Sequence, residues 1–166
     1  MANKVVFFDR DGTLNRDVGY LHRIEDFIWM PGAKEAVRYV NGHGYLAVVA
    51  TNQSGVARGY YKASDVVRVY DWMNETLAAF GAHLDALYYC PHYVGGKIAK
   101  YAKPCDCRKP KTGMVDAACA KYDIDRAASY LVGDSETDMA CAENAGLKGI
   151  RYAGGDLLAL VKGTVK

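Results

Sequence analysis

The sequence lacks any apolar stretch that approaches the roughly 20 residues needed to cross a lipid bilayer. It also lacks the start of a secretory signal peptide, because the apolar run in MANKVVFFDRDG is short and ends at a charge. A charge imbalance is missing too, since 21 basic and 19 acidic residues leave a net charge of +2. No strong field therefore favours nucleic acid or a membrane surface as a partner. These absences predict a cytoplasmic protein that binds neither nucleic acid nor a membrane.

Internal repeats and low-complexity linkers are also absent, and 166 residues are about the length of one domain. We therefore expect a single domain over residues 1–166. What the sequence does contain is a set of apolar β-type runs, expected as strands at residues 4–8, 45–50, 84–89, 129–132 and 148–152. Because these runs are apolar throughout, they favour an α/β fold with a doubly wound, Rossmann-like parallel sheet covered on both faces.

Helical patterns separate the expected strands, with apolar residues three and four positions apart. We expect a helix that begins near residue 33, a second that is capped by Ser64 and stops at Gly81, and further helices near residues 115–122, 136–146 and 156–163. Cys119 and Cys141 fall within these patterns, and we expect them to be packing residues.

Polar loops follow four of the expected strands: DRDGTLN, TNQSG, a cysteine-rich segment and GDSETD. Ligands of parallel α/β sheets bind at the carboxyl ends of the strands. We therefore expect these four loops to meet at one edge of the sheet and to form the functional site.

Asp9 and Asp11 stand directly after the first expected strand. Two carboxylates this close repel each other unless a cation or a shared proton intervenes, and Mg²⁺ prefers such oxygen ligands. Asp9 is placed to attack phosphorus and form an aspartyl phosphate, and Asp11 to act as acid and base. Asp134, after the fourth strand, is expected to complete the Mg²⁺ site. The alternative is a strand-ending turn, in which Asp and Gly are common without any chemistry.

Further polar groups follow the second and fourth strands. Asp138 has two interpretations of equal weight, a further site carboxylate or simple compensation of a helix dipole. Lys109 and Arg108 supply positive charge for a phosphoryl transition state. Short side chains that are expected to hold phosphoryl oxygens follow the second strand, namely Thr51, Asn52, Gln53 and Ser54.

The segment CPHYVGGKIAKYAKPCDCRKP contains a C-x-H pair and a C-x-C pair, which are Cys90, His92, Cys105 and Cys107. Thiolate and imidazole ligands suit tetrahedral Zn²⁺. Four protein ligands leave no open position, so we expect a structural zinc that clips the loop over residues 90–107 and aims Arg108 and Lys109 at the phosphate. Unliganded cysteines are one alternative. A nucleic-acid finger is another, which the near-neutral charge and the lack of a recognition helix at finger spacing disfavour.

These residues carry a resemblance. DRDGTLN, TNQSG, Lys109 and GDSETD match, in order, the four motifs of the haloacid-dehalogenase-type phosphatases, from Asp9 to Asp138. Within that superfamily the chain resembles the capless branch that contains histidinol-phosphate phosphatase and D-glycero-D-manno-heptose-1,7-bisphosphate 7-phosphatase. The stretches TNQSGVARG, YYCPH and CDCRKP look closest to the heptose family.

The resemblance implies a Mg²⁺-dependent phosphoric monoester hydrolase that takes the C7 phosphate from the heptose bisphosphate, as a monomer. It implies that Asp9, the backbone carbonyl of Asp11 and Asp134 hold Mg²⁺, and that the four Cys and His side chains hold Zn²⁺. Thr51 and Lys109 would steady the phosphoryl group, and Arg108 would recognise the substrate. The residues implied to border the sugar are Asp17, Val18, Gly19 and Tyr20.

The sequence departs from the heptose family at Ser135, where that family often has a lysine. A substrate contact is therefore missing or supplied elsewhere. Two rival functions stay open. Histidinol phosphate is the alternative substrate. A receiver-like phospho-acceptor domain is the alternative of another class, although its acceptor Asp would follow the third strand, where this chain has cysteine.

Overall fold

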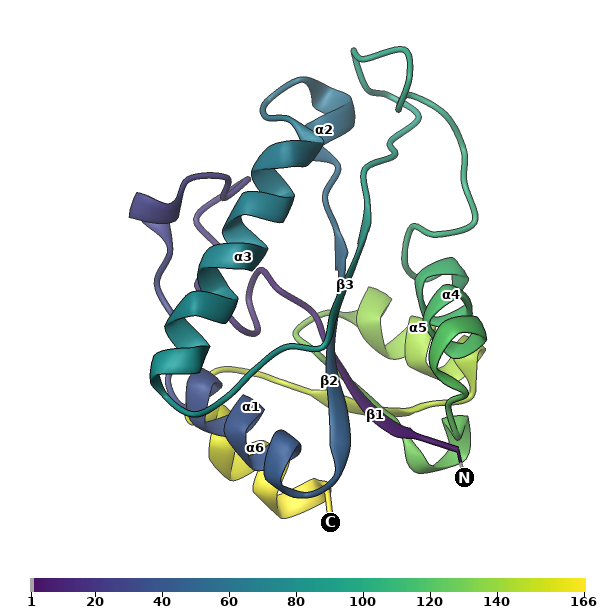
Figure 1. Ribbon diagram of the computed structural model, residues 1–166. Helices are drawn as coiled ribbons and strands as arrows, with labels where there is room; N and C mark the ends of the chain where they lie inside the picture. The colour runs from purple at the N-terminus through teal and green to yellow at the C-terminus, as the bar shows by residue number, and fades with distance from the viewer. Residues whose placement is uncertain (1) are drawn as a thin grey trace.

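The computed structural model describes residues 2–166 and contains one five-stranded sheet in which every pair of neighbours is parallel. The strand order is β3-β2-β1-β4-β5 (Figure 1). This confirms the predicted doubly wound parallel sheet. The strands are β1 (Lys4–Phe8), β2 (Tyr45–Asn52), β3 (Ala86–Cys90), β4 (Tyr130–Gly133) and β5 (Lys148–Arg151).

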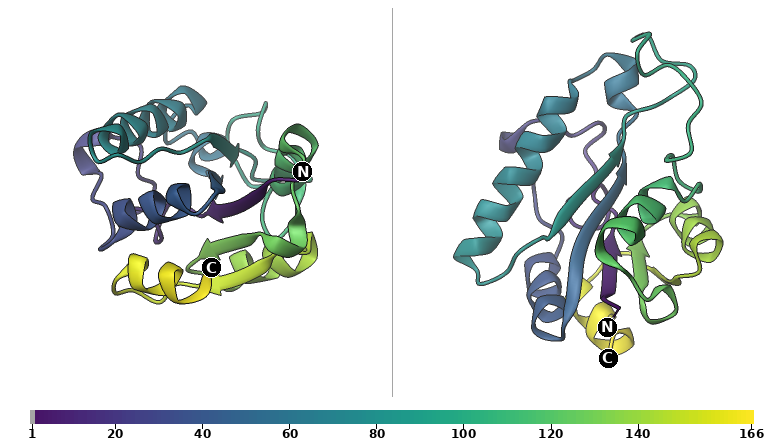
Figure 2. Two further views of the ribbon diagram at one scale, coloured as in Figure 1. Left: turned by 60° about the horizontal axis from the view of Figure 1, so that its bottom comes forward. Right: turned by 45° about the vertical axis from the view of Figure 1, so that its right-hand side comes forward.

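Helices cover both faces of the sheet (Figure 2). The helices are α1 (Ala33–Gly42), α2 (Gly55–Arg58), α3 (Ala63–Ala79), α4 (Gly113–Tyr122), α5 (Glu136–Ala145) and α6 (Leu157–Thr164), with 3₁₀ turns at Ile24–Asp26 and Arg126–Ala128. Successive side chains of a strand point to opposite faces. In β1, Val6 and Phe8 pack in the core under α1, α3 and α6, whereas Val5 and Phe7 pack under α4 and α5. The unbroken apolar run of β1 is therefore explained by burial on both faces.

The structure differs from the sequence-based predictions in local detail, and β3, for example, begins at Ala86 instead of residue 84. The predicted cap Ser64 is wrong, because α3 begins at Ala63 and is capped by Lys62, whose backbone N–H donates to the Asp65 carboxylate at 2.8 Å. Strand β2 runs two residues further than expected and ends at Asn52. The short helix α2 was not predicted, because four residues are too few to show a helical period.

Two long segments without regular strands or long helices leave the carboxyl edge of the sheet, residues 9–32 after β1 and residues 91–112 after β3. Within residues 2–166, no inserted cap domain stands over that edge, so the fold is capless as expected. In the same range no helix is long and apolar enough to span a bilayer.

Candidate active site

The four polar loops meet at the carboxyl edge of the sheet, around a cavity of 670 Å³. Its walls include all the residues predicted as nucleophile, acid and base, or substrate contacts, except Val18. Val18 is 47% exposed and lines a separate hollow instead. The convergence follows from the topology, because parallel strands present their carboxyl ends at one edge.

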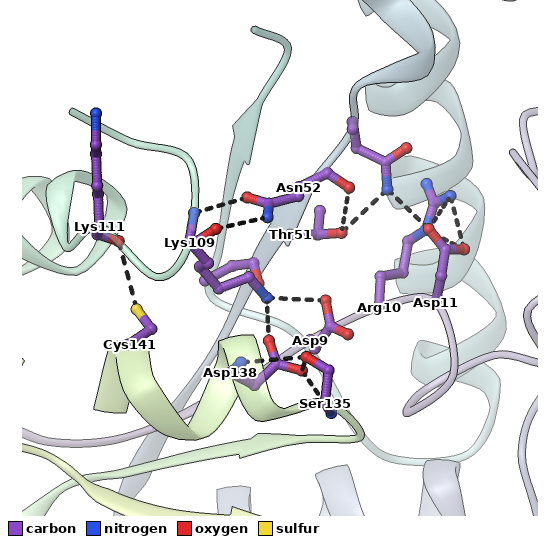
Figure 3. Close-up of polar contacts among 12 residues, drawn as sticks. Asp9, Arg10, Asp11, Thr51, Asn52, Lys109, Lys111, Ser135, Asp138 and Cys141 are labelled. Carbon is purple, nitrogen blue, oxygen red and sulfur yellow. Dashed lines mark hydrogen bonds and ion pairs between the residues drawn. The ribbon is translucent and has the colours of Figure 1, made fainter. Parts of the chain in front are cut away.

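Lys109 ties the centre of the site together (Figure 3). Its ammonium group donates to Asp9 Oδ1 at 3.0 Å, to Asp138 Oδ1 at 2.6 Å and to the carbonyl of Ala50 at 2.8 Å. Burial alone would lower the pKa of Lys109, but the charges of Asp9 and Asp138 more than offset it, so the pKa is raised. Lys109 therefore stays a cation at the point where phosphoryl charge would develop.

Asp9 and Asp138 are both buried carboxylates of this group. Burial raises the pKa of Asp9 from 3.8 to about 7; Lys109 opposes the shift and the negative charge of Asp138 adds to it. Burial likewise raises the pKa of Asp134. A cation bound beside Asp9 and Asp134 would oppose both shifts.

Asp138 performs both of the roles that the sequence left open. As the third residue of α5 it forms a capping box with Ser135, because its Oδ2 accepts from the Ser135 N–H and hydroxyl while its own N–H donates to Ser135 Oγ. Its other oxygen accepts from Lys109. Ser135 thus serves as a helix cap that holds the partner of Lys109.

Three carboxylates could hold a metal ion here: Asp9, Asp134 and Asp138 offer ligand atoms that all lie within 4.8 Å of one another. Gly12 permits this approach, since its φ is +87° and a Cβ there would lie 2.2 Å from Asp134 Oδ2. Oxygen ligands at this spacing suit Mg²⁺. The side chain of Asp11 is not in the group, and its predicted contribution is only a backbone carbonyl.

Asp11 is held by three donors on the other side of the cavity floor. Arg10 donates to it at 3.0 Å, Asn15 at 3.0 Å and Gln53 Nε2 at 3.0 Å. Gln53 in turn donates to Thr51 Oγ1 and accepts from the Tyr61 hydroxyl. These three donors fix the direction of the Asp11 carboxylate.

Asn52 holds the backbone of Lys109 rather than pointing freely into the cavity. Its Oδ1 accepts from the Lys109 N–H at 2.9 Å and its amide donates to the Lys109 carbonyl at 3.2 Å. From the sequence, Asn52 was one of four residues predicted to contact the phosphoryl oxygens.

Sequence reasoning also missed Arg10, Asn15 and Tyr61. Arg10 and Asn15 lie in the motif DRDGTLN, one and four positions from Asp11, so the motif itself could have drawn attention to them. Tyr61 lies eight positions from its partner Gln53, and no pattern marks that contact.

The Cys and His cluster lies beside the cavity and could also hold a metal ion. Cys90 Sγ lies 3.0 Å from Cys107 Sγ and 3.5 Å from Cys105 Sγ, and His92 Nδ1 lies 3.3 Å from Cys107 Sγ. Four ligands about 2.3 Å from a tetrahedral zinc are separated by about 3.8 Å, and these side chains lie somewhat closer together than that, so it is the donor set of three thiols and one imidazole that suits zinc. Burial raises the pKa of the Cys90 thiol, which a bound cation would reverse.

Comparison with known proteins agrees with this geometry. The HAD-hydrolase-like family model matches residues 106–158. The crystal structure of D,D-heptose 1,7-bisphosphate phosphatase from B. bronchiseptica, complexed with magnesium and phosphate, superposes with a TM-score of 0.82 at 32% identity, covering 98% of this chain and 88% of that one. Fold and site thus define a phosphatase of the haloacid-dehalogenase-like class.

Comparison with curated relatives identifies the family within the haloacid-dehalogenase-like phosphatases. The chain is 48% identical to D-glycero-beta-D-manno-heptose-1,7-bisphosphate 7-phosphatase of Haemophilus ducreyi, over 89% of this chain and 81% of that protein. It is 42% identical to D-glycero-alpha-D-manno-heptose-1,7-bisphosphate 7-phosphatase of Burkholderia mallei, over 89% of this chain and 78% of that protein. The chain belongs to the D-glycero-D-manno-heptose-1,7-bisphosphate 7-phosphatase family.

Proposed function

We propose that this protein removes the C7 phosphate from D-glycero-D-manno-heptose 1,7-bisphosphate and releases heptose 1-phosphate and inorganic phosphate. The observation that supports this most is the buried Asp9 carboxylate, 3.0 Å from Lys109 on the floor of an open cavity. Membership of the heptose family supports the choice of substrate. An open cavity without a cap suits a small phosphorylated sugar.

The reaction proceeds in two displacements on phosphorus. An Asp9 oxygen attacks phosphorus, the bond from phosphorus to the C7 oxygen breaks, and Asp11 gives its proton to that oxygen. Asp11 then takes a proton from water, whose oxygen attacks the aspartyl phosphate. The bond from phosphorus to Asp9 breaks, and inorganic phosphate leaves. The three donors around Asp11 hold its side chain in one position for both proton transfers.

Mg²⁺, when bound by Asp9, Asp134 and the Asp11 carbonyl, neutralises charge on the phosphoryl oxygens. Lys109 and the Thr51 hydroxyl hold the same oxygens from the protein side. Asn52, Gln53 and Ser54 line this wall of the cavity. The side that would face the sugar is lined by Asp17, Gly19, Tyr20 and Arg108.

The Cys and His cluster holds a structural zinc in this proposal. Its four ligands come from both ends of the loop over residues 90–107, and Arg108 and Lys109 follow Cys107 directly. A closed tetrahedral site offers no position for water or substrate, so the metal acts on the loop and not on phosphorus.

We also propose that residues 1–166 form one domain that works as a monomer in the cytoplasm. The single sheet, with a core on each face, supports one domain. Sedimentation velocity at micromolar concentration is expected to give the 18.2 kDa mass of one chain. A larger species that keeps activity on dilution would contradict the monomer.

The test is steady-state phosphate release with Mg²⁺ from both anomers of heptose 1,7-bisphosphate and from histidinol phosphate in one assay. A higher kcat/KM for a heptose bisphosphate is expected, and the ratio of the two anomers names the physiological one. A preference for histidinol phosphate would overturn the substrate and keep the chemistry. A stable phospho-protein without turnover would favour the receiver-like alternative. The structure gives that alternative no support, because a receiver domain has its acceptor Asp after the third strand and β3 of this chain ends at Cys90.

A further inference from the structure

Arg58 is an arginine whose charge no carboxylate neutralises. Five of the nine arginines form an ion pair with a carboxylate, namely Arg10, Arg23, Arg68, Arg126 and Arg151. Among residues 2–166, no carboxylate oxygen lies within 4.0 Å of a guanidinium nitrogen of Arg58 or Arg108. Both side chains are only half-buried, so each is available to an anion from solution.

One tyrosine ring holds these two guanidinium groups. The Arg58 Cζ lies 3.9 Å from the centroid of Tyr93, and the Arg108 Cζ lies 5.4 Å from it. Stacking on a ring orients a guanidinium and leaves N–H groups at its edge. Arg108 Nη1 donates to the His92 carbonyl at 3.4 Å and Arg58 Nε donates to Ser54 Oγ at 3.3 Å, so the other N–H groups of each side chain are available to a phosphate. Two like charges near one ring repel each other, and a bound anion would offset that repulsion.

The backbone holds this arrangement in place. The carbonyl of Ala57 accepts from the N–H groups of Lys97 and Ile98 at 2.8 and 2.9 Å, which joins the loop carrying Tyr93 to α2, next to Arg58. Gly96 permits the contact, because a Cβ there would lie 2.5 Å from the Ala57 carbonyl oxygen. Figure 1 shows α2 beside the outer end of that loop.

Arg58 does not itself line the cavity of the active site, but it contacts residues that do. Its Nε donates to Ser54 Oγ at 3.3 Å, and its Cζ lies 5.6 Å from the ring of Tyr20. Ser54, Tyr20 and Arg108 all line that cavity. Tyr20 holds a left-handed φ of 56° and packs edge-on against Tyr60, which fixes that ring beside the guanidinium.

We propose that Arg58 is a specificity-determining residue that, together with Arg108 on the Tyr93 ring, binds the phosphate that is not hydrolysed. The inference rests on the proposed function, since only a bisphosphate brings a second phosphate. The floor of the cavity, with Lys109, takes the phosphoryl group that is transferred. Two forked cations at the rim match the charge and the oxygens of a second dianion. A sugar monophosphate gains nothing from them.

The experiment compares heptose 1,7-bisphosphate with heptose 7-phosphate, which differ only in the second phosphate. For Arg58→Ala, kcat/KM on the bisphosphate is expected to fall about 10- to 100-fold, mainly through KM. On the 7-phosphate it is expected to change by less than about threefold. Arg58→Lys keeps the charge but loses the fork, so an intermediate loss is expected.

Arg38→Ala is the matched control. Arg38 also lacks a carboxylate partner and lies 4.3 Å over an aromatic ring, that of Phe80, but it is exposed on α1 at the far end of the molecule (Figure 1). Its kinetics on both substrates are expected to match the wild type. Tyr93→Ala is expected to lower activity on the bisphosphate selectively, as Arg58→Ala does, whereas Tyr93→Phe keeps the ring and the preference.

Product inhibition gives a second readout. Heptose 1-phosphate retains the phosphate in question, so its inhibition constant is expected to rise about 10-fold or more in Arg58→Ala, while inhibition by inorganic phosphate stays unchanged. Wild-type protein that hydrolyses neither heptose substrate would overturn the proposed function. Active wild-type protein with an Arg58→Ala variant that loses nothing, or loses equally on both substrates, would overturn this assignment alone.

Discussion

The floor and the rim of the cavity use charge in opposite ways. On the floor, Lys109 is 4% exposed and makes three hydrogen bonds, two of them to the carboxylates of Asp9 and Asp138. At the rim, Arg58 and Arg108 stack on Tyr93, and neither has a carboxylate partner among residues 2–166. A buried charge must be paired, whereas a half-exposed one can stay open for a ligand. The charges on the floor are therefore paired before substrate binds, whereas in our proposal the charges at the rim are paired only by a phosphate of the substrate.

This contrast predicts how variants separate. Floor variants should lower kcat for every phosphate ester, while rim variants should raise KM for the bisphosphate alone. A floor variant that altered only KM would contradict this division between the floor and the rim of the cavity.

The largest effect is expected from Asp9→Asn. The change keeps the shape of the side chain but removes the nucleophile, so kcat should fall by at least about 10³-fold on both heptose substrates. Phosphate release under saturating substrate measures this. The fold should survive, since Asn at position 9 still accepts from Lys109. Wild-type turnover in this variant would show that Asp9 is not the nucleophile.

Asp138→Asn tests the pairing on the floor. Lys109 loses one of its two anionic partners, so we expect the free energy of unfolding to fall by about 2 kcal/mol and kcat by about 10- to 100-fold. Urea unfolding and steady-state kinetics measure the two effects. Glu136→Gln is the control in the same helix turn: its pair with Arg151 is exposed, so a change below about 0.5 kcal/mol is expected. Equal effects of both variants would refute the special role of Asp138.

Cys105→Ser tests whether the metal cluster supports the rim. Losing one of four ligands should lower the zinc content, the melting temperature and the order of the loop that carries Tyr93 and Arg108. KM for the bisphosphate should rise about 10-fold, and more than kcat falls. Metal analysis of chelator-free protein, thermal melts and kinetics give the three readouts. Cys119→Ser, outside the cluster, is the control; native protein without zinc would contradict the prediction.

The raised pKa of Asp9 gives a prediction for pH. Between the usual value of 3.8 and about 7, the folded state binds this proton more tightly than the unfolded state does. The stabilisation is therefore complete below about pH 4 and is lost as the pH rises through about 7 in metal-free protein. Mg²⁺ should raise the melting temperature more at about pH 7.5 than at about pH 5, because it binds the ionised carboxylates. Asp9→Asn should flatten both dependences; an equal Mg²⁺ effect at both pH values would argue against this site.

The smallest effect is expected from Tyr61→Phe. It removes the hydroxyl that Gln53 accepts from, and Gln53 positions both Asp11 and Thr51. A fall in kcat of about two- to fivefold with KM unchanged is expected from steady-state kinetics. Tyr60→Phe is the control, because Tyr60 is exposed and contacts Tyr20 through its ring. An unchanged kcat in Tyr61→Phe would show that Gln53 holds Asp11 without this support.

The sequence by itself determined the sheet and the place of the site. Apolar periodicity located all five strands, and parallel topology then required DRDGTLN, TNQSG and GDSETD to meet at one edge. The C-x-H and C-x-C pairs likewise indicated one cluster, and their side chains do lie together. These features are local or follow from strand order, so a linear pattern carries them.

Only the tertiary structure decided which of these side chains face one another. Whether Asp138 caps a helix or pairs with Lys109 depends on the distance between two loops, and both contacts exist. Arg58 and Arg108 are 50 positions apart and meet only because the loop from β3 folds back onto Ala57. Long-range contacts of this kind depend on packing in three dimensions, and no spacing along the chain encodes them.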